Sequence, residues 1–244
     1  MPGVSIRTAT RSGPVNTPVP ETGRYFVAGI TARGPANQAV KCRSLAEFEV
    51  MFGGRVPTSY LHDDLRVFFE EGGTEAWVSR AVGGAATVGT VTLKDTTDPA
   101  AVDSVRVDAI GPGAWSADVA LLAGEPTGGG AFLFVSYGPT QEVHKADSVE
   151  ALVGKVNATS RLVRATHLGG NGTLAQSSPN LSAGDDKVDT VTASTVLNAV
   201  TTAFGAELGT GAVALPGYSA TVDSGNVYVD LITWAKTTRR VALM

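Results

Sequence analysis

The amino-acid sequence predicts an α/β core interrupted by an inserted, mostly-β domain and preceded by an extended arm. Helical patterns and short apolar runs alternate in residues 24–83 and again in 187–244, which is typical of βαβ units with parallel strands. The segment between them, 84–186, is rich in Gly, Thr and Val and alternates with the period of two that β-strands have. Residues 1–23 contain seven Gly and Pro residues, which favour an extended arm over a packed element.

The first core segment is expected to fold as strand, helix, helix, strand. Ser44 and Glu47 have the spacing of a capping box, in which the two side chains satisfy N–H groups at a helix start. Leu61 and Leu65 begin the apolar stripe of a second helix, which repeats this design. In chain order, the expected elements are a strand over 24–31, helices over 44–54 and 59–73, and a strand over 75–82.

Apolar patterns also predict the elements of the inserted segment and of the second core segment. Alternating or continuous apolar runs predict strands near 91–93, 105–107, 118–124, 131–138 and 160–168, with a helix over 147–156 and a polar loop over 169–186. The second core segment predicts a helix over 192–206, a strand over 211–217, a helix over 224–240 and a strand from 241. A helix between two apolar runs predicts that those two strands are parallel.

Composition excludes several classes of protein. The formal net charge of −4 argues against a nucleic-acid binder held by bulk charge, and no apolar run reaches the roughly 18 residues of a membrane span. Cys42 is the only cysteine, so no internal disulfide and no thiolate metal cluster is expected. Residues 1–43 carry six basic side chains and one acid. This segment could bind phosphate or an acidic surface of another copy, or it could be a solvated charge bias.

The stretch AIGPGAWSADVALLAG, residues 109–124, raises the question of a nucleotide site because Gly111 and Gly113 begin like a phosphate-binding loop. Such a loop needs a third glycine and a following helix. Ser116 stands at the third position, Pro112 lacks an N–H donor, and the residues that follow are strand-like. We therefore interpret this stretch as a structural turn and expect no bound cofactor.

No catalytic or metal-binding residues are expected. His62 lies beside Asp63 and Asp64 on the polar side of a helix, where a solvated face is the favoured interpretation. His144 and His167 lack any nucleophile motif around them, although distance in sequence does not exclude a triad. The remaining acids that we interpret as solvated, because they lack metal-ligand spacing, are Glu70, Glu71, Asp185, Asp186 and Asp189.

Seven segments, taken in order, resemble the contractile tail sheath proteins of bacteriophages and related injection systems. They are MPGVSI, RYFVAGITARGPANQAVKCRSLAEFEVMFGG, SYLHDDLRVFFEEGGTEAWVSRAV, GPGAWSADVAL, VNATSRLVRA, GGNGT and VALPG with WAKTTRRVALM. The resemblance implies a core of subtilisin-like topology without protease activity, and a turn at Pro112, Gly113 and Trp115. It also implies a missing C-terminal part, because family members continue past the position of Met244.

The resemblance further implies a structural subunit that polymerises around a tail tube and contracts to drive the tube through a host envelope. Its partners would be further copies in hexameric rings stacked helically, the tail tube protein, and baseplate and tail terminator proteins, in a virion tail assembled in the bacterial cytoplasm. The short β-capable run from Val4 to Ile6, with Arg7 and Arg11, is the expected subunit interface, since an arm can add a strand to a neighbour's sheet. Two alternatives remain, a β-rich binding module, for carbohydrate as an example, and an α/β hydrolase without a recognisable motif.

Overall fold

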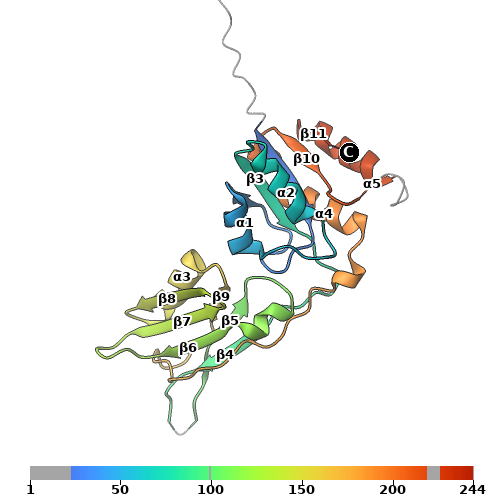
Figure 1. Cartoon of the computed structure of the whole chain (residues 1–244). Coiled ribbons are helices and arrows are strands. Elements are labelled where there is room, and N and C mark those ends of the chain that lie inside the picture. The colour runs from blue at the N-terminus through green and yellow to red at the C-terminus, as the bar shows by residue number, and fades with distance from the viewer. Residues whose placement is uncertain (1–22, 99, 219–225, 244) are drawn as a thin grey trace, which may run out of the picture.

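The computed structural model describes residues 23–98, 100–218 and 226–243, which form two lobes (Figure 1). The α/β lobe is built on a five-stranded sheet with the order β11-β10-β1-β3-β2. Its strands are β1 (Arg24–Gly29), β2 (Val40–Cys42), β3 (Glu75–Arg80), β10 (Ala212–Ala214) and β11 (Val241–Ala242). All neighbours in this sheet are parallel except β2, which pairs antiparallel with β3. The parallel pairing of β10 and β11 across a helix confirms the predicted βαβ unit, whereas β2 was not predicted.

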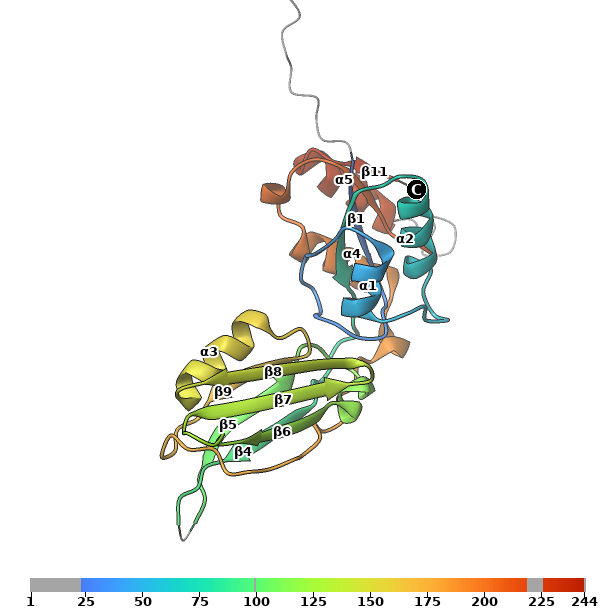
Figure 2. The same cartoon turned by 60° about the vertical axis from the view of Figure 1, so that its left-hand side comes forward.

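Helices cover both faces of this sheet (Figure 2). Helices α1 (Leu45–Phe52) and α2 (Leu61–Glu70) pack on one face, and α4 (Ala193–Ala203) and α5 (Asn226–Thr237) on the other. Successive side chains of a strand point to opposite faces, so Tyr25 and Val27 of β1 belong to the core under α1 and α2, while Phe26 and Ala28 belong to the core under α4 and α5. A strand buried on both sides must be apolar throughout, which explains the continuous apolar run that predicted it.

The predicted capping box at the start of α1 is only half formed. The Ser44 hydroxyl accepts the Glu47 N–H at 3.2 Å, but the Glu47 carboxylate accepts from the Arg43 N–H at 2.8 Å instead of from Ser44. The reciprocal arrangement occurs at α4, where the side chains of Thr192 and Thr195 each accept from the other's backbone N–H. Helix α2 has the predicted apolar stripe, with Leu61 and Leu65 buried, but it begins after Tyr60 with no side-chain cap.

The second lobe contains two three-stranded antiparallel sheets that face each other around one core, with α3 (Val149–Thr159) against them (Figure 2). One sheet has β4 (Thr90–Lys94), β5 (Asp103–Ala109) and β9 (Val163–His167), and the other has β6 (Ala120–Gly124), β7 (Ala131–Tyr137) and β8 (Thr140–Ala146). Strand β8 escaped prediction because its side chains are mostly polar and only His144 is fully buried. A short 3-10 helix over Ala114–Asp118 precedes β6, so the strand that was expected from residue 118 begins at Ala120.

Residues 169–186 contain no helix or strand, which agrees with the predicted polar loop, but this loop is held against the second lobe. The backbone of Ser177 exchanges two hydrogen bonds with Ala123 of β6, at 2.9 and 3.0 Å, so the segment runs along the edge of that sheet. Leu174 and Leu181 are buried in the core of this lobe. Two leucines among polar residues give too weak a pattern to indicate an edge segment. The position of this segment is set by its backbone pairing with β6.

Gly154 offers a test of helix energetics in α3. It is exposed, and a Cβ added to it would meet no atom within 4 Å. A glycine inside a helix costs about 0.5–1 kcal/mol relative to alanine because the unfolded chain loses more freedom. Gly154→Ala is therefore expected to raise the free energy of unfolding by about that amount, measured by urea denaturation. A decrease would show that the glycine has a structural role in α3.

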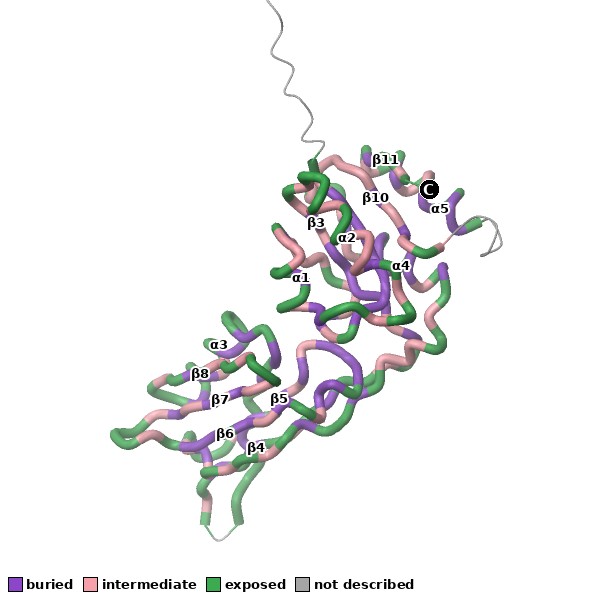
Figure 3. The backbone as a smooth tube through the Cα atoms, in the orientation of Figure 1, coloured by how far each residue is buried: buried purple, intermediate pink, exposed green. Residues whose placement is uncertain are grey.

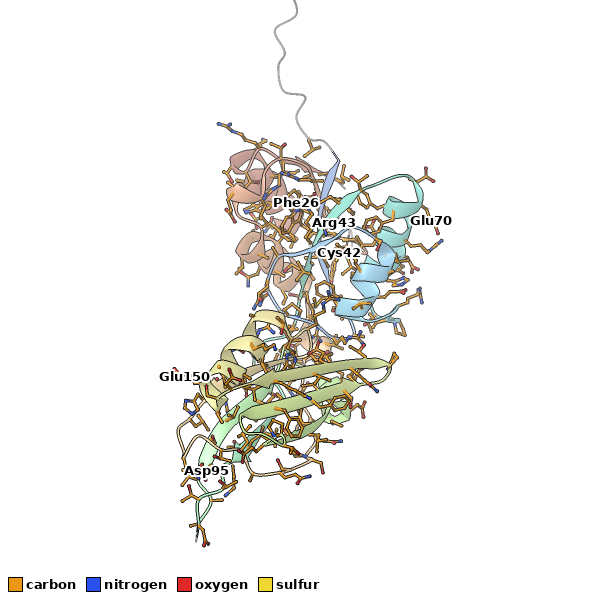
Figure 4. All side chains as sticks on the ribbon, turned by 90° about the vertical axis from the view of Figure 1, so that its left-hand side faces the viewer. Phe26, Cys42, Arg43, Glu70, Asp95 and Glu150 are labelled. Carbon is orange, nitrogen blue, oxygen red and sulfur yellow. The ribbon has the colours of Figure 1, made fainter. Side chains whose placement is uncertain are left out.

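Asp95 lies at the end of the second lobe that is remote from the α/β lobe (Figure 4), and its side chain is inaccessible to solvent. Its carboxylate accepts from the Thr97 hydroxyl at 2.6 Å and from the backbone N–H groups of Thr97, Val102 and Asn171 at 3.1, 2.7 and 2.8 Å. These hydrogen bonds, that of the Thr97 hydroxyl first, hold the pKa of Asp95 well below its usual range. The ionised carboxylate thus ties the β4–β5 connection to the glycine-rich segment after β9.

Asp95→Asn is expected to lower the thermal unfolding midpoint at pH 7. Because the folded pKa of Asp95 is depressed, its stabilisation is present above the unfolded pKa of about 3.9 and is lost as the pH falls toward the folded value. The difference between wild type and variant should therefore shrink below about pH 4, measured by thermal unfolding from pH 7 to pH 2. Asp103→Asn is the control, because Asp103 is exposed and 3.9 Å from its partner Lys94. A difference that stays constant with pH would contradict this assignment.

Candidate functional site

The junction between the lobes is formed by two chain segments that pass side by side, one leaving β3 and one returning to α4 (Figure 1). The backbones of Thr87 and Asp185 exchange two hydrogen bonds, at 2.7 and 2.9 Å, and the Gly83 N–H donates to the Asp186 carbonyl at 2.9 Å. The lobes are thus joined by a paired connection and not by two independent linkers. Such pairing restricts how far one lobe can turn relative to the other.

Arg80, the last residue of β3, fixes this junction from within. Its side chain is fully buried. One terminal nitrogen, Nη1, donates to the carbonyls of Gly34 at 3.1 Å and Pro112 at 2.7 Å, and Nη2 donates to the Asp186 carboxylate at 2.8 Å. Gly34 belongs to the α/β lobe, Pro112 to the second lobe and Asp186 to the returning segment. One guanidinium therefore connects all three parts of the chain.

The charge of Arg80 depends on these partners. Burial lowers the pKa of Arg80 to about 10, and the nearby Asp186 carboxylate opposes that shift. The side chain therefore stays protonated at neutral pH, and its fixed planar fork suits several acceptors at once. Among the described residues, the Nε atom has no hydrogen-bond partner. A buried charge with such partners is costly to disturb, because removing either side leaves the other uncompensated.

The Gly-Pro-Gly stretch that raised the question of a nucleotide site lies at this junction, where the connection from β5 to β6 is largely buried (Figure 3). A Cβ added to Gly111 would lie only 1.9 Å from the Gly34 carbonyl oxygen. The Pro112 carbonyl accepts from Trp115 Nε1 at 3.0 Å as well as from Arg80. Gly113 has a φ of 125°, in the region that glycine adopts most readily. The glycines thus allow two backbones to meet, and the space next to Gly111 is filled by protein.

Aromatic side chains extend the junction on one side. The rings of Trp115 and Tyr137 meet edge to face, with centroids 5.5 Å apart. The guanidinium of Arg33, from the α/β lobe, lies 4.9 Å from the centroid of the Tyr137 ring. A cation over an aromatic face is attracted by the ring quadrupole. Arg33 therefore makes a second contact between the lobes that the sequence did not predict.

Several residues that the sequence placed on solvated surfaces are partly buried. His62 has a side chain only 13% exposed, with Nε2 2.9 Å from the Glu49 carboxylate. Asp64 accepts from the Tyr25 hydroxyl at 2.6 Å. Burial raises the pKa of Asp64 against the opposing effect of that hydrogen bond, and burial together with Asp64 raises the pKa of Tyr25. The solvated-face interpretation is therefore wrong for His62 and Asp64, because helix periodicity does not show that α1 and β1 lie against this face.

The other candidate residues are not brought together into one site. His144 is buried between Glu142 and Thr159, 3.3 Å from each. The Ser160 hydroxyl donates to Glu142 at 2.6 Å, and the Thr159 hydroxyl donates to the Lys155 carbonyl at 2.8 Å, so neither hydroxyl gives its proton to the histidine. Asp186 is half-buried in the junction, which corrects its assignment to a solvated loop, while Asp185, Asp189 and His167 are exposed.

Cys42 is buried, and its pKa is raised to about 12 by burial and by Glu47. In the parts of the chain that the structure describes, no group of three or more His, Cys, Asp and Glu side chains could hold a metal ion. No helix among those parts is long and apolar enough to cross a membrane. The expected interface residues Val4, Ile6, Arg7 and Arg11 lie outside the described residues.

Comparison with known proteins finds likeness in structure only. No family model matches the sequence, and no curated protein matches it. A sheath tail protein from Listeria innocua superimposes with a TM-score of 0.58 at 17% identity, covering 90% of this chain and 45% of that one. A sheath tail protein from Desulfitobacterium hafniense gives 0.55 at 18% identity, covering 97% of this chain and 50% of that one.

This chain therefore spans about half the length of the two solved proteins. At such low identity the shared property is the fold, and that fold extends through both lobes and the junction between them. The resemblance seen in the sequence segments is confirmed at this level. The chain has the fold of the tail sheath proteins.

Proposed function

We propose that this protein is a structural subunit of a contractile tail sheath, which polymerises around a tail tube and contracts to drive it through a host envelope. The observation that supports this proposal is the fold likeness to two sheath tail proteins over 90% and 97% of the chain. The proposed location is a virion tail, assembled in the bacterial cytoplasm. The proposed partners are further copies in hexameric rings stacked helically, the tail tube protein, and baseplate and tail terminator proteins.

The proposed role is mechanical and not enzymatic. Contraction of such an assembly is a rearrangement of rigid bodies toward new contacts between them. It requires that force pass through each subunit without loss at an internal hinge. The hydrogen bonds of Arg80 to Gly34, Pro112 and Asp186, which we call the Arg80 clamp, and the paired connection supply that stiffness, since they join the lobes by buried and charge-assisted hydrogen bonds. The subtilisin-like topology of the core and the division into domains at 24–83, 84–186 and 187–244 belong to this proposal.

The proposed joint between subunits is residues 1–23. In this proposal the run from Val4 to Ile6 adds a strand to the sheet of a neighbouring copy, and Arg7 and Arg11 meet its acidic surface. Strand addition uses backbone hydrogen bonds, so it holds subunits together while their bodies rotate. The turn at Pro112, Gly113 and Trp115 has a structural role and binds no ligand.

Deleting residues 1–20 is expected to leave a folded protein that no longer assembles. Circular dichroism checks the fold, and electron micrographs of the purified chain with a tail tube protein as template check assembly. The full chain should form tubes with six-fold symmetry, whereas the deletion variant should not. A matched variant, Arg7→Glu with Arg11→Glu, should weaken assembly in a manner that depends on salt. Tubes formed by the deletion variant would contradict the arm proposal, and absence of tubes or rings from the full chain would contradict the sheath proposal.

A further inference from the structure

A cavity of about 430 Å3 lies where β2 and α1 of the α/β lobe meet the second lobe. We call it the interlobe cleft. The α/β lobe contributes Lys41 and Arg43 together with the apolar side chains of Val50 and Met51, and the second lobe contributes Arg161. Figure 4 shows Cys42 and Arg43 beside α1 in the α/β lobe. The cleft is separate from the Arg80 clamp, whose partners do not line it.

Two arginines from different lobes line this cleft, and among the described residues of the lining only Glu47 carries a carboxylate. Arg43 and Arg161 are both exposed, and neither forms an ion pair with another residue that the structure describes. Lys41 is already paired with Glu75 at 2.6 Å. The carboxylate of Glu47, also in the lining, accepts from the Arg43 backbone N–H at 2.8 Å. The cleft therefore carries excess positive charge, which favours an anionic group.

Apart from Ser44, the rest of the lining is apolar, and this decides what kind of anion fits. Val50 is 45% exposed although it is a large apolar side chain, and Met51 beside it is half-buried. A free phosphate would satisfy the arginines but would leave this apolar surface in water. A peptide segment with carboxylates next to an apolar side chain matches both halves of the cleft. Its volume also lies in the range of about 300–1,000 Å3 that is usual for ligand sites.

We propose that the interlobe cleft binds an acidic peptide segment of another polypeptide. Its carboxylates lie between Arg43 and Arg161, where planar guanidinium groups recognise carboxylates by paired hydrogen bonds. An apolar side chain of the segment covers Val50 and Met51. Because the two arginines belong to different lobes, the bound segment also bridges the lobes. The inference rests on the lining of the cleft and holds whether or not the chain assembles into a sheath.

The methyl group of Met51 provides a direct readout. The sequence contains three methionines, Met1, Met51 and Met244. Met51 lines the cleft, and the other two lie outside the residues that the structure describes. The protein labelled with 13C at its methionine methyl groups is titrated with a blocked pentapeptide of alternating leucine and glutamate. We expect a saturable shift of the Met51 signal. The same peptide with glutamine in place of glutamate, and inorganic phosphate by itself, should leave that signal unchanged.

Single variants test the role of charge. Arg161→Glu should lower the affinity for the acidic peptide by at least about tenfold, since a hydrogen bond to a charged group is lost and repulsion replaces it. Lys236→Glu is the matched control, because Lys236 is an exposed residue of α5 outside the cleft. This variant should bind the acidic peptide with the affinity of the wild type. Arg43→Glu repeats the test from the other lobe if Arg161→Glu does not fold.

Four results would overturn the proposal. They are no shift of Met51 at millimolar acidic peptide, an equal shift with the glutamine peptide, unchanged affinity in both arginine variants, and a Met51 shift produced by phosphate alone. The last result would define a simple anion site in place of a peptide site.

Discussion

Arg80→Met is expected to lower the free energy of unfolding by about 3–5 kcal/mol, the range for breaking a buried ion pair by removing one partner. Methionine fills much of the space but donates no hydrogen bond. The carbonyls of Gly34 and Pro112 and the carboxylate of Asp186 would then lose the donor they share. Unsatisfied buried acceptors cost free energy that the added apolar contact does not offset.

A double-mutant cycle with Asp186→Asn separates the charge pair from the carbonyl contacts. The double variant should be less destabilised than the sum of the single variants, because Asp186 is then no longer left as an uncompensated charge. Urea denaturation followed by circular dichroism gives the free energies. Hydrogen exchange at the connections 81–89 and 182–192 reports whether the junction opens first. A loss below about 1 kcal/mol in Arg80→Met, well under the range above, would show that Arg80 does not hold the lobes together.

Gly111→Ala is expected to destabilise the junction by about 1–3 kcal/mol or more, which is the usual cost of overpacking. The new Cβ would lie 1.9 Å from the Gly34 carbonyl oxygen, 2.8 Å from its carbonyl carbon and 3.3 Å from Pro35 Cα. All three atoms belong to the backbone, so no flexible side chain can move aside. Since the Gly34 carbonyl also accepts from Arg80 Nη1, displacing it weakens the clamp as well.

Gly84→Ala is the matched control for this substitution. Gly84 lies on the connection between the lobes, but a Cβ added there meets no atom within 4 Å. It should leave the free energy of unfolding nearly unchanged in the same urea experiment. Small-angle scattering adds a second measurement, because separating Gly34 from Gly111 should widen the distribution of distances between the lobes in Gly111→Ala only. Equal behaviour of the two variants would contradict the close backbone contact.

The sequence predicted local elements well wherever apolar side chains recur with a clear period. The two-sided burial of β1 produces a continuous apolar run, and the Ser44 cap marks the start of α1. Strands β2 and β8 were missed because their side chains are mostly polar or half-buried. Their position depends on pairing with β3 and β7, which backbone hydrogen bonds provide without any pattern in the side chains.

The candidate site was barely accessible to prediction. An arginine at the end of a strand is usually exposed, and nothing near Arg80 in the sequence indicates that Gly34, Pro112 and Asp186 surround it. The Gly-Pro-Gly stretch was correctly separated from phosphate-binding loops by its missing third glycine and by its proline. The sequence could not show why residue 111 is glycine, because glycine is favoured both in a turn and where two backbones meet.

By itself, then, the sequence determined the mixed α/β class, the order of most elements and the resemblance to tail sheath proteins. The class and the order of elements depend on periodic apolar patterns, caps and turns, which act over a few neighbouring residues. Only the tertiary structure decided how the lobes are joined, which charges are buried and where two arginines share a cleft. Those properties arise from contacts between residues far apart in the chain, and the free energy of such contacts depends on burial and distance, which local sequence does not encode.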